Sequence, residues 1–295
     1  MTRQYLRHVN LIVSQGGQGI DLSEMHIQFQ VFAPDADAPP TAYIRIWNLA
    51  ENTRNRIQKE FDHVSLQAGY SDPGMIFDGT IVQVKKGAED AVNKFVDIMA
   101  SDLDDFYNFN VVSKTLAKGS SQADQLKVVG GDKLGSTPSD LGAGGTLPRG
   151  KVLFGMGREY MASIARSTNT SWFIQNGKIN VIKRDGYLPG DVVVMNSGTG
   201  MIEVPEATNE GVMVKCLLNP KIKTGGRIKL NNSDVTTTTI KRPGMFPTYK
   251  SINLPANLSA DGVYRVLVVE HFGDNRGNQF ESHLTCLSMS GGTNG

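Results

Sequence analysis

Short runs of alternating apolar and polar residues dominate the first third of the chain. Within residues 25–31, every odd-numbered residue is apolar and every even-numbered residue is polar. A period of two is typical of half-buried β-strands, because successive side chains of a strand point to opposite faces. The pattern predicts further strands over residues 5–13, 42–47, 64–70, 75–85 and 94–100. Together these strands predict a small β-barrel or sandwich.

One short helix is predicted to interrupt these strands. Asn48 is suited to cap its N-terminus, and Glu51 follows three residues later, as in a capping box. Four residues repeat at helical spacing along one face, namely Leu49, Thr53, Ile57 and Phe61. Because this face would have to be buried, we expect the helix to pack across the open end of the sheet.

Periodicity is lost after residue 113. Residues 119–150 contain eight Gly, four Ser and two Pro, the composition of a flexible or extended surface loop. A domain boundary is expected near the start of this segment. The loop is predicted to end where a helix of about four turns begins near Leu153 and runs to Ala165.

A β-hairpin is predicted to follow this helix. Asn176 and Gly177 form the pair of residues that the type I′ turn prefers, and alternating runs lie on both sides of them. Helix and hairpin together predict a small α+β unit.

Strand patterns return in the last third of the chain. They cover residues 212–218, 227–230, 263–272 and 280–287. The stretches 236–239 and 243–247 are interpreted as an exposed connection between strands. The first and last parts of the chain each end in a long hairpin, at residues 75–100 and 263–287, which raises the possibility of an internal duplication.

Composition and charge exclude several classes of function. The chain has 295 residues, enough for two domains or three small ones. Its 30 Lys plus Arg against 29 Asp plus Glu give a net charge of +1, which supplies no field to concentrate DNA, RNA or anionic lipid. No run reaches the roughly 18 apolar residues of a membrane helix, and residues 1–8 are polar. We therefore expect a cytosolic product with no specific nucleic acid ligand and no resident membrane segment.

The candidate motifs for phosphate and dinucleotide binding are weak. Residues 145–152 fall one residue short of the phosphate-binding pattern, because Val152 stands where a hydroxyl is needed and Pro148 stiffens the loop. Gly155 and Gly157 lack the third glycine of a dinucleotide fingerprint, and close helix–strand packing explains them better. We expect no cofactor.

Nucleophiles and metal ligands are equally sparse. Cys216 and Cys286 have no zinc spacing and lie in apolar runs, so we expect two buried thiols. His283 is three residues from Cys286, which places the two side chains on opposite faces of a strand. The histidines form no metal-binding spacing and are interpreted as solvated or hydrogen-bonded side chains; they are His8, His26, His63, His271 and His283. We expect no metal site.

The tight acidic group of the chain is Asp102, Asp104 and Asp105. Because it follows a strand, a solvated turn is the favoured interpretation. A glycosidase would need two carboxylates in different environments, and the sequence does not mark such a pair. No residue is assigned a catalytic role.

Three stretches together resemble the baseplate hub proteins of contractile-tailed bacteriophages, a family also fused into secretion-system spikes. The first stretch is YIRIWNLAENTR at 43–54, VSLQAGY at 64–70 and IFDGTI at 76–81. The second is RGKVL at 149–153, the helix to residue 165 and SWFIQNGKI at 171–179. The third is GMIEVPEATNEGV at 200–212, LLNPKI at 217–222, YRV at 264–266 and GDNRG at 273–277.

The resemblance implies a mainly β fold with some α (α+β), in which two tube-like β-barrel domains flank a small α+β domain. The expected domains are residues 1–108, residues 109–205 with the glycine-rich loop 119–150, and residues 206–295. Structural anchors are expected at Trp47 and Tyr70 in the first domain, at Trp172 in the middle domain, and at Gly273 and Gly277 in the closing turn of the third.

The function implied is that of a structural virion protein without enzymatic activity. Three copies would form a homotrimeric hub that adapts the sixfold tail tube to the threefold central spike and leaves a channel for genome passage. Its partners would be the tail tube or tube-initiator protein, the central spike protein and other baseplate proteins. Its place would be the tail baseplate of the virion, after assembly in the cytoplasm of the bacterial host.

Two other classes of function remain open on the sequence. A tail-associated peptidoglycan hydrolase is suggested by the acidic group around Asp102 and by a cleft that the long loop could cover. A carbohydrate-binding module is suggested by Trp47 and Trp172 if either ring is exposed.

Overall fold

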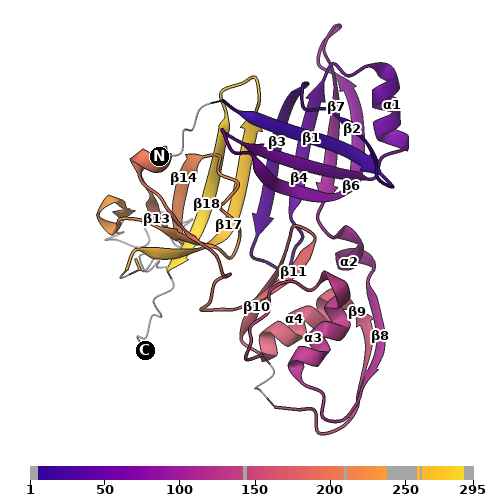
Figure 1. Ribbon diagram of the computed structural model, residues 1–295, viewed down its shortest axis with the longest axis vertical. Helices are drawn as coiled ribbons and strands as arrows, with labels where there is room; N and C mark the ends of the chain where they lie inside the picture. Colours follow the sequence, from indigo (N-terminus) through magenta and orange to yellow (C-terminus); the bar gives the residue numbers. More distant parts are fainter. Residues whose placement is uncertain (1–5, 142–144, 209–210, 238–257, 260, 289–295) are drawn as a thin grey trace, which may run out of the picture.

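The computed structural model describes residues 6–141, 145–208, 211–237, 258–259 and 261–288. Two β-rich units lie side by side, and a smaller α+β unit lies against them at one end (Figure 1). Among the described helices, none is both long and apolar enough to span a bilayer.

The first unit is an antiparallel sheet with one helix. Its strands run in the order β3-β4-β7-β6-β5-β1-β2. The elements are β1 (His8–Gln15), β2 (Gln18–Asp21), β3 (His26–Pro34), β4 (Thr41–Trp47), α1 (Glu51–Lys59), β5 (His63–Gly69), β6 (Gly74–Ala88) and β7 (Lys94–Ser101). The predicted alternation is confirmed, because the odd-numbered positions of β3 from Ile27 to Val31 are buried and the positions between them are exposed.

The middle unit carries most of the helices. Its elements are α2 (Asp104–Phe109), β8 (Val111–Leu116), α3 (Gln122–Gly130), the short 3-10 helix η1 (Gly131–Lys133), β9 (Lys151–Met156), α4 (Gly157–Ser167), β10 (Thr170–Gln175) and β11 (Lys178–Lys183). The hairpin of β10 and β11 turns at Asn176 and Gly177, both with positive φ, as the sequence predicts.

The third unit is again mainly strand. Its elements are β12 (Val192–Val194), η2 (Ser197–Thr199), β13 (Glu206–Thr208), β14 (Gly211–Leu217), β15 (Arg227–Lys229), η3 (Asn232–Asp234), β16 (Thr236–Thr237), β17 (Val263–Asp274) and β18 (Phe280–Ser288). The long hairpins predicted near the ends of the first and last parts are β6–β7 and β17–β18. The predicted connection at 236–239 begins with β16, and the rest of it, with 243–247, lies outside the described residues.

Strands β3 and β17 join the first and third units into one sheet. They pair antiparallel from Val268 opposite Pro34 to Asp274 opposite Gln28. The described sheet has 14 strands, and its main path runs β16-β13-β14-β18-β17-β3-β4-β7-β6-β5-β1-β2. The mainly β, α+β fold is therefore confirmed. The described path does not close on itself, so the two separate barrels stay unconfirmed.

Three clusters of buried hydrophobic residues correspond to the three parts of the chain. The first cluster fills the N-terminal unit but also takes in Leu218 and Phe280 from the third unit. The hydroxyl of Tyr70 donates to the carbonyl of Phe280 at 3.0 Å, which ties the two units at the same place. The domain boundaries at residues 108 and 205 stay a prediction.

The predicted cap of the first helix is wrong, although its buried face is right. Helix α1 begins at Glu51 after Ala50, and no side chain caps it. Asn48 instead has φ of 56°, and its side-chain oxygen accepts a hydrogen bond from the backbone N–H of Lys94 at 3.1 Å. Leu49, Ile57 and Phe61 are buried as expected.

Two predictions in the middle unit are wrong. The segment 119–150 is not only loop, because Ser121 and Asp124 form a capping box that starts α3, and Leu126 of this helix is buried. The helix expected from Leu153 begins only at Gly157, because residues 151–156 pair with β8 as strand β9.

Candidate functional site

The sheet that joins the first and third units has an outward face that crosses the β3–β17 boundary without interruption. Residues directly opposite one another form a row from Met99 through Tyr43, Gln30 and Phe272 to Glu281. All five side chains point away from the core, and Tyr43 is exposed. The row makes one continuous surface from two units of the chain.

Polar and aromatic pairs fix this face at the boundary of the two units. His26 of β3 stacks on Trp47 of β4 with ring centroids 4.1 Å apart. Its Nε2 lies 2.9 Å from Oδ1 of Asp274 on β17. Arg45 makes two hydrogen bonds to Asp97, at 2.6 and 2.9 Å. These contacts hold four strands in register, namely β3, β4, β7 and β17, so the face is suited to present a fixed surface to a partner.

The two ends of this sheet offer strand edges. Within the described residues, β2 pairs only with β1, and β16 pairs only with β13. A strand at the end of a sheet leaves half of its backbone N–H and C=O groups for another chain to bind. The edges therefore lie at opposite ends of one sheet, in the arrangement that head-to-tail contact requires.

A buried ion pair joins all three units. Arg265 of β17 is paired with Asp35, which directly follows β3, and both side chains are almost fully buried. Ser171 of β10 donates to Asp35 at 2.7 Å and accepts from Arg265 at 3.0 Å. The guanidinium also donates to the carbonyls of Arg184 at 3.0 Å and Gly186 at 3.3 Å. Arg265 therefore fixes the relative position of the three units.

Asp102 is a second link between units, and the solvated turn predicted for it is wrong. The carboxylate is only 3% exposed and accepts hydrogen bonds from the backbone N–H of Gly177 at 3.0 and 3.2 Å. Burial raises the pKa of Asp102 to about 6. Asp104 and Asp105 lie apart from this link, in the first turn of α2. The acidic group is thus split between a buried contact and a helix terminus.

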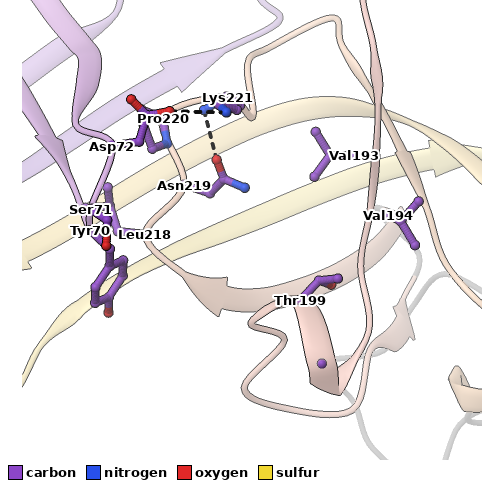
Figure 2. Close-up of a pocket in the computed structure, with 11 residues that line it drawn as sticks. Tyr70, Ser71, Asp72, Val193, Val194, Thr199, Leu218, Asn219, Pro220 and Lys221 are labelled. Atoms are coloured by element: carbon purple, nitrogen blue, oxygen red, sulfur yellow. Dashed lines mark hydrogen bonds and ion pairs between the residues drawn. The ribbon is translucent and has the colours of Figure 1, made fainter. Parts of the chain in front are cut away.

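Figure 2 shows a cavity of about 520 Å³ between the first and third units. Its lining combines the apolar side chains of Val193 and Leu218 with Asp72 and Lys221, which form an ion pair at 3.3 Å. The backbone N–H of Lys221 also donates to Asn219 at 3.0 Å. Asp72 is the carboxylate among these lining residues, and it is mostly exposed. A catalytic acid or base usually needs a partly buried environment, so we interpret the cavity as a docking notch and not as an active site.

The predicted anchors are mostly packed as expected. Trp172 is buried in the middle unit, and Trp47 is half-buried against His26, so Trp172 is no platform for a sugar. Gly277 lies in the turn between β17 and β18, where its N–H donates to Asp274 at 2.6 Å. Gly273 precedes that turn, as a strand residue of β17.

The cysteines and histidines follow the sequence interpretation. Cys216 and Cys286 are free and buried, and burial raises the pKa of Cys216 to about 12 and that of Cys286 further. His283 points to the opposite face of β18 from Cys286, and its Nε2 lies 3.0 Å from Oε1 of Glu281. His271 is fully buried, and this lowers its pKa to about 4.

The glycine-rich motif at residues 145–152 leads into strand β9 and not into a phosphate-binding turn. Gly157 is the first residue of α4, and a Cβ there would lie 2.4 Å from Nδ2 of Asn110. Close packing between α4 and the start of β8 therefore explains this glycine, as predicted.

Sequence reasoning missed the tie formed by Arg265, Asp35 and Ser171. One signal was present, because Arg265 stands alone in the apolar run from Val263 to Val269. A charged residue in such a run needs a buried partner. The partner is 230 positions away, and no local pattern points to it.

Comparison with known proteins finds one family match over part of the chain. The family described as baseplate hub gp41 matches residues 157–235, so the resemblance to baseplate hubs is confirmed. No curated protein matches in sequence.

Solved structures share the fold at low sequence identity. The tail protein from Neisseria meningitidis MC58 is 9% identical with a TM-score of 0.60, and the match covers 96% of both chains. The 43 kDa tail protein of prophage MuSo2 from Shewanella oneidensis is 7% identical with a TM-score of 0.60, covering 96% of this chain and 97% of that one.

A third similar structure comes from a secretion system. The c3393 protein of E. coli is described as a component of the type VI secretion system with structural similarity to T4 bacteriophage tail proteins gp27 and gp5. It is 9% identical with a TM-score of 0.56, covering 90% of this chain and 73% of that one. The fold is thus one that phage tail proteins and a secretion-system component have in common.

Proposed function

We propose that the chain is a structural hub of a phage tail baseplate, which acts as a homotrimer between the tail tube and the central spike. The observation that carries the proposal is the single sheet formed by the first and third units through β3 and β17. The baseplate hub match over residues 157–235 and the fold shared with tail proteins over nearly the whole chain support it.

The joined units suit a change of symmetry. A threefold spike and a sixfold tube cannot use one repeated contact, but a trimer whose subunits each carry two similar β units presents six lobes to the tube and three subunits to the spike. The hairpins β6–β7 and β17–β18 hold corresponding places at the ends of the two units, which fits the proposed duplication. Arg265 and Asp102 keep the units from moving relative to each other.

Ring closure would use the strand edges at β2 and at β13–β16. Head-to-tail contacts between unlike surfaces generate closed rings when the rotation closes. The notch of Figure 2 lies between the units and would receive a segment of the neighbouring subunit. The partners of the ring would be the tube or tube-initiator protein, the spike and other baseplate proteins. A channel along the axis would let the genome pass, with the hub resident in the virion baseplate after assembly in the host cytoplasm.

A peptidoglycan hydrolase is the weaker proposal. Its best carboxylate is Asp102, whose pKa is raised as a general acid would need. Both oxygens of Asp102 accept from the Gly177 amide, and the space beside them is only about 30 Å³, too small for a sugar. Zymography on cell-wall substrate tests this, and lysis that Asp102→Asn abolishes would overturn the structural role.

Mass photometry of the purified chain, followed by cryo-electron microscopy, tests the hub. We expect particles of three chains with a threefold axis and a central channel. The variant Gln18→Lys adds a charge to the exposed edge strand β2 and should reduce the trimer fraction. Gln30→Lys adds the same charge in mid-sheet on β3 and should not. Monomers at every concentration, for the unaltered chain, would refute the proposal.

A further inference from the structure

The two-stranded sheet of β8 and β9 has one covered face and one uncovered face. Val112, Leu116 and Leu153 are buried in the core of the middle unit, where α3 and α4 lie. Three apolar side chains of the same two strands are exposed instead; they are Val111 at 58%, Val152 at 69% and Phe154 at 74%. An apolar surface on both sides of a thin sheet indicates that the second side has a partner.

The cross-strand register gathers these side chains on one surface. Val111 is opposite Met156, Ser113 is opposite Phe154, and Thr115 is opposite Val152. Directly opposite residues of an antiparallel pair point to the same face. Val111, Val152, Phe154 and the half-buried Met156 therefore share one face of the sheet with Ser113 and Thr115. We call it the β8–β9 face and define it by these four apolar residues.

Phe154 is held in place by its own backbone. The hydroxyl of Tyr160 accepts a hydrogen bond from the N–H of Phe154 at 2.8 Å and donates one to its carbonyl at 3.2 Å. The N–H and the carbonyl of Phe154, at the unpaired edge of β9, are therefore both hydrogen-bonded to Tyr160. An added strand could not pair with β9 at this residue. A fixed backbone also presets the direction of the side chain, which lowers the entropy cost of using it as an anchor. Docking here would use the face of the sheet.

Exposed basic residues lie beyond one end of the β8–β9 face. Residues 111–123 and 145–158 contain no Asp or Glu, although the chain as a whole is nearly neutral. Four exposed basic residues belong to these segments. Lys114 and Lys151 lie opposite Leu153 and Leu116, at positions of the covered face, whereas Lys118 and Arg149 lie beyond the ends of the two strands. Lys151 donates to Gln125 at 2.9 Å, and the other three make no ion pair with the described part of the chain.

The charges are concentrated at one end of the face. Leu116 is opposite Lys151, so Lys118 and Arg149 lie just beyond the same end of the two strands. The nearby Asp124 is engaged at the start of α3, where it accepts from the backbone N–H and hydroxyl of Ser121 at 2.8 Å. Lys118 and Arg149 are exposed and make no ion pair within the described residues, so they are available to an outside partner.

We propose that the β8–β9 face binds an acidic segment of a partner protein. Apolar side chains of that segment would pack on Phe154 and Val152, and its carboxylates would meet the basic residues at the end of the face. Figure 1 shows α3 and α4 between this sheet and the β10–β11 hairpin, so the face lies on the flank of the middle unit that is turned away from that hairpin. The surface is thus separate from the edges proposed for the ring.

Fluorescence anisotropy with two labelled peptides tests the chemistry on the full chain. One peptide alternates Glu with Leu, and the other alternates Lys with Leu. We expect the acidic peptide to bind at least about tenfold more tightly, since charge and apolar contact then act together. Phe154→Ser should weaken binding by about tenfold or more, and Phe154→Leu should recover part of the loss. Val92→Ser removes an equally exposed apolar side chain from the β6–β7 hairpin and should change nothing.

Several outcomes would overturn the proposal. Equal binding of the two peptides would remove the role of charge, and unaltered binding by Phe154→Ser with an unchanged melting temperature would remove the role of the face. Binding to vesicles containing phosphatidylglycerol that Phe154→Ser abolishes would assign the face to a membrane surface instead. None of these measurements depends on trimer formation, so failure here is distinguishable from failure of the hub proposal.

A photo-crosslinking experiment identifies the occupant in assembled tails. Phe154 is replaced by p-benzoyl-phenylalanine, and the crosslinked peptide is sequenced by mass spectrometry. We expect a crosslink to an acidic segment of a different tail protein. A crosslink to a second copy of this chain, or to a segment without acidic residues, would refute the assignment.

Discussion

Removal of Arg265 should weaken the contact between the three units of the chain, because this residue of the third unit binds Asp35 of the first and Ser171 of the middle unit. In Arg265→Met, the carboxylate of Asp35 stays buried without its cation and keeps only the Ser171 hydroxyl as a side-chain donor. Breaking one partner of a buried ion pair costs about 3–5 kcal/mol, because the remaining charge is uncompensated. We expect a loss of that size in the free energy of unfolding.

The double variant Arg265→Met/Asp35→Leu separates the charge from the packing. Replacing both members of a buried pair by apolar residues is often close to neutral. The carbonyls that Arg265 would leave, at Arg184 and Gly186, lie in a segment open to water, which can replace the lost donors. The double variant should therefore be more stable than Arg265→Met, with a coupling energy of at least about 2 kcal/mol.

Urea unfolding followed by tryptophan fluorescence measures these differences, because Trp172 lies next to Ser171 on β10. Arg45→Met is the matched control. Arg45 pairs with Asp97 on the sheet surface and is 37% exposed, so its loss should cost no more than about 1 kcal/mol. Equal costs for Arg265→Met and Arg45→Met, or additive effects in the double variant, would refute the reasoning.

Three further predictions concern buried groups. Because burial raises the pKa of Asp102 from 3.8 to about 6, the folded chain holds a proton that the unfolded chain releases. The stabilisation that this proton gives the folded chain is therefore complete below pH 3.8, the ordinary pKa of the group, and is lost as the pH rises through about 6. Urea titrations should show a fall of about 3 kcal/mol across that window, absent in Asp102→Asn, and a flat profile in the unaltered chain would contradict this. Gly273→Val should lower the melting temperature, because a Cβ there would lie 2.2 Å from the ring of Phe29. We expect the free energy of unfolding to fall by about 1–3 kcal/mol. An unchanged melting temperature would argue against this packing. Cys216 and Cys286, whose pKa values burial raises, should react with a thiol reagent only after unfolding, and fast reaction in the native state would show that they are accessible.

The parts of the fold that could be predicted are those in which one face is buried and the other wet. Strand β3 alternates because its inward side chains fill a core and its outward ones meet solvent. Strands β8 and β9 escaped prediction for the opposite reason. Their uncovered face carries Val111, Val152 and Phe154, so the sequence does not alternate there.

Composition misled the interpretation of the segment 119–150. Its glycines flank helix α3, and averaging over the segment concealed the capping box of Ser121 and Asp124. The pairing of β3 with β17 was also beyond local reasoning, because the two strands are more than two hundred positions apart. Contacts of that range leave no mark on the period of either strand.

The candidate site could likewise be predicted only in part from the sequence. The resemblance to baseplate hubs came from motif order along the chain, and the family match over residues 157–235 overlaps the second and third of the three stretches. Asp102 was noticed for its acidic neighbours, but its burial under the turn at Gly177 depends on how two units dock. Sequence therefore marked the residue, and only the packing of the units assigned its role.

Although the net charge of the chain is near zero, two of its surfaces differ in whether their charged residues are paired, and this difference bears on assembly. On the outward face of the large sheet, charges are matched in pairs such as Arg45 with Asp97 and Lys215 with Glu281. Matched charges exert little force at a distance, which suits contacts made through strand edges and apolar area. Beyond the Leu116–Lys151 end of the β8–β9 face, the basic residues Lys118 and Arg149 make no ion pair within the described part of the chain. Unmatched charge acts over about a Debye length, so it can steer a flexible acidic segment to the periphery after the ring has formed. The proposed order of assembly is therefore ring first and peripheral partner second, and the binding of the partner alone should weaken with added salt.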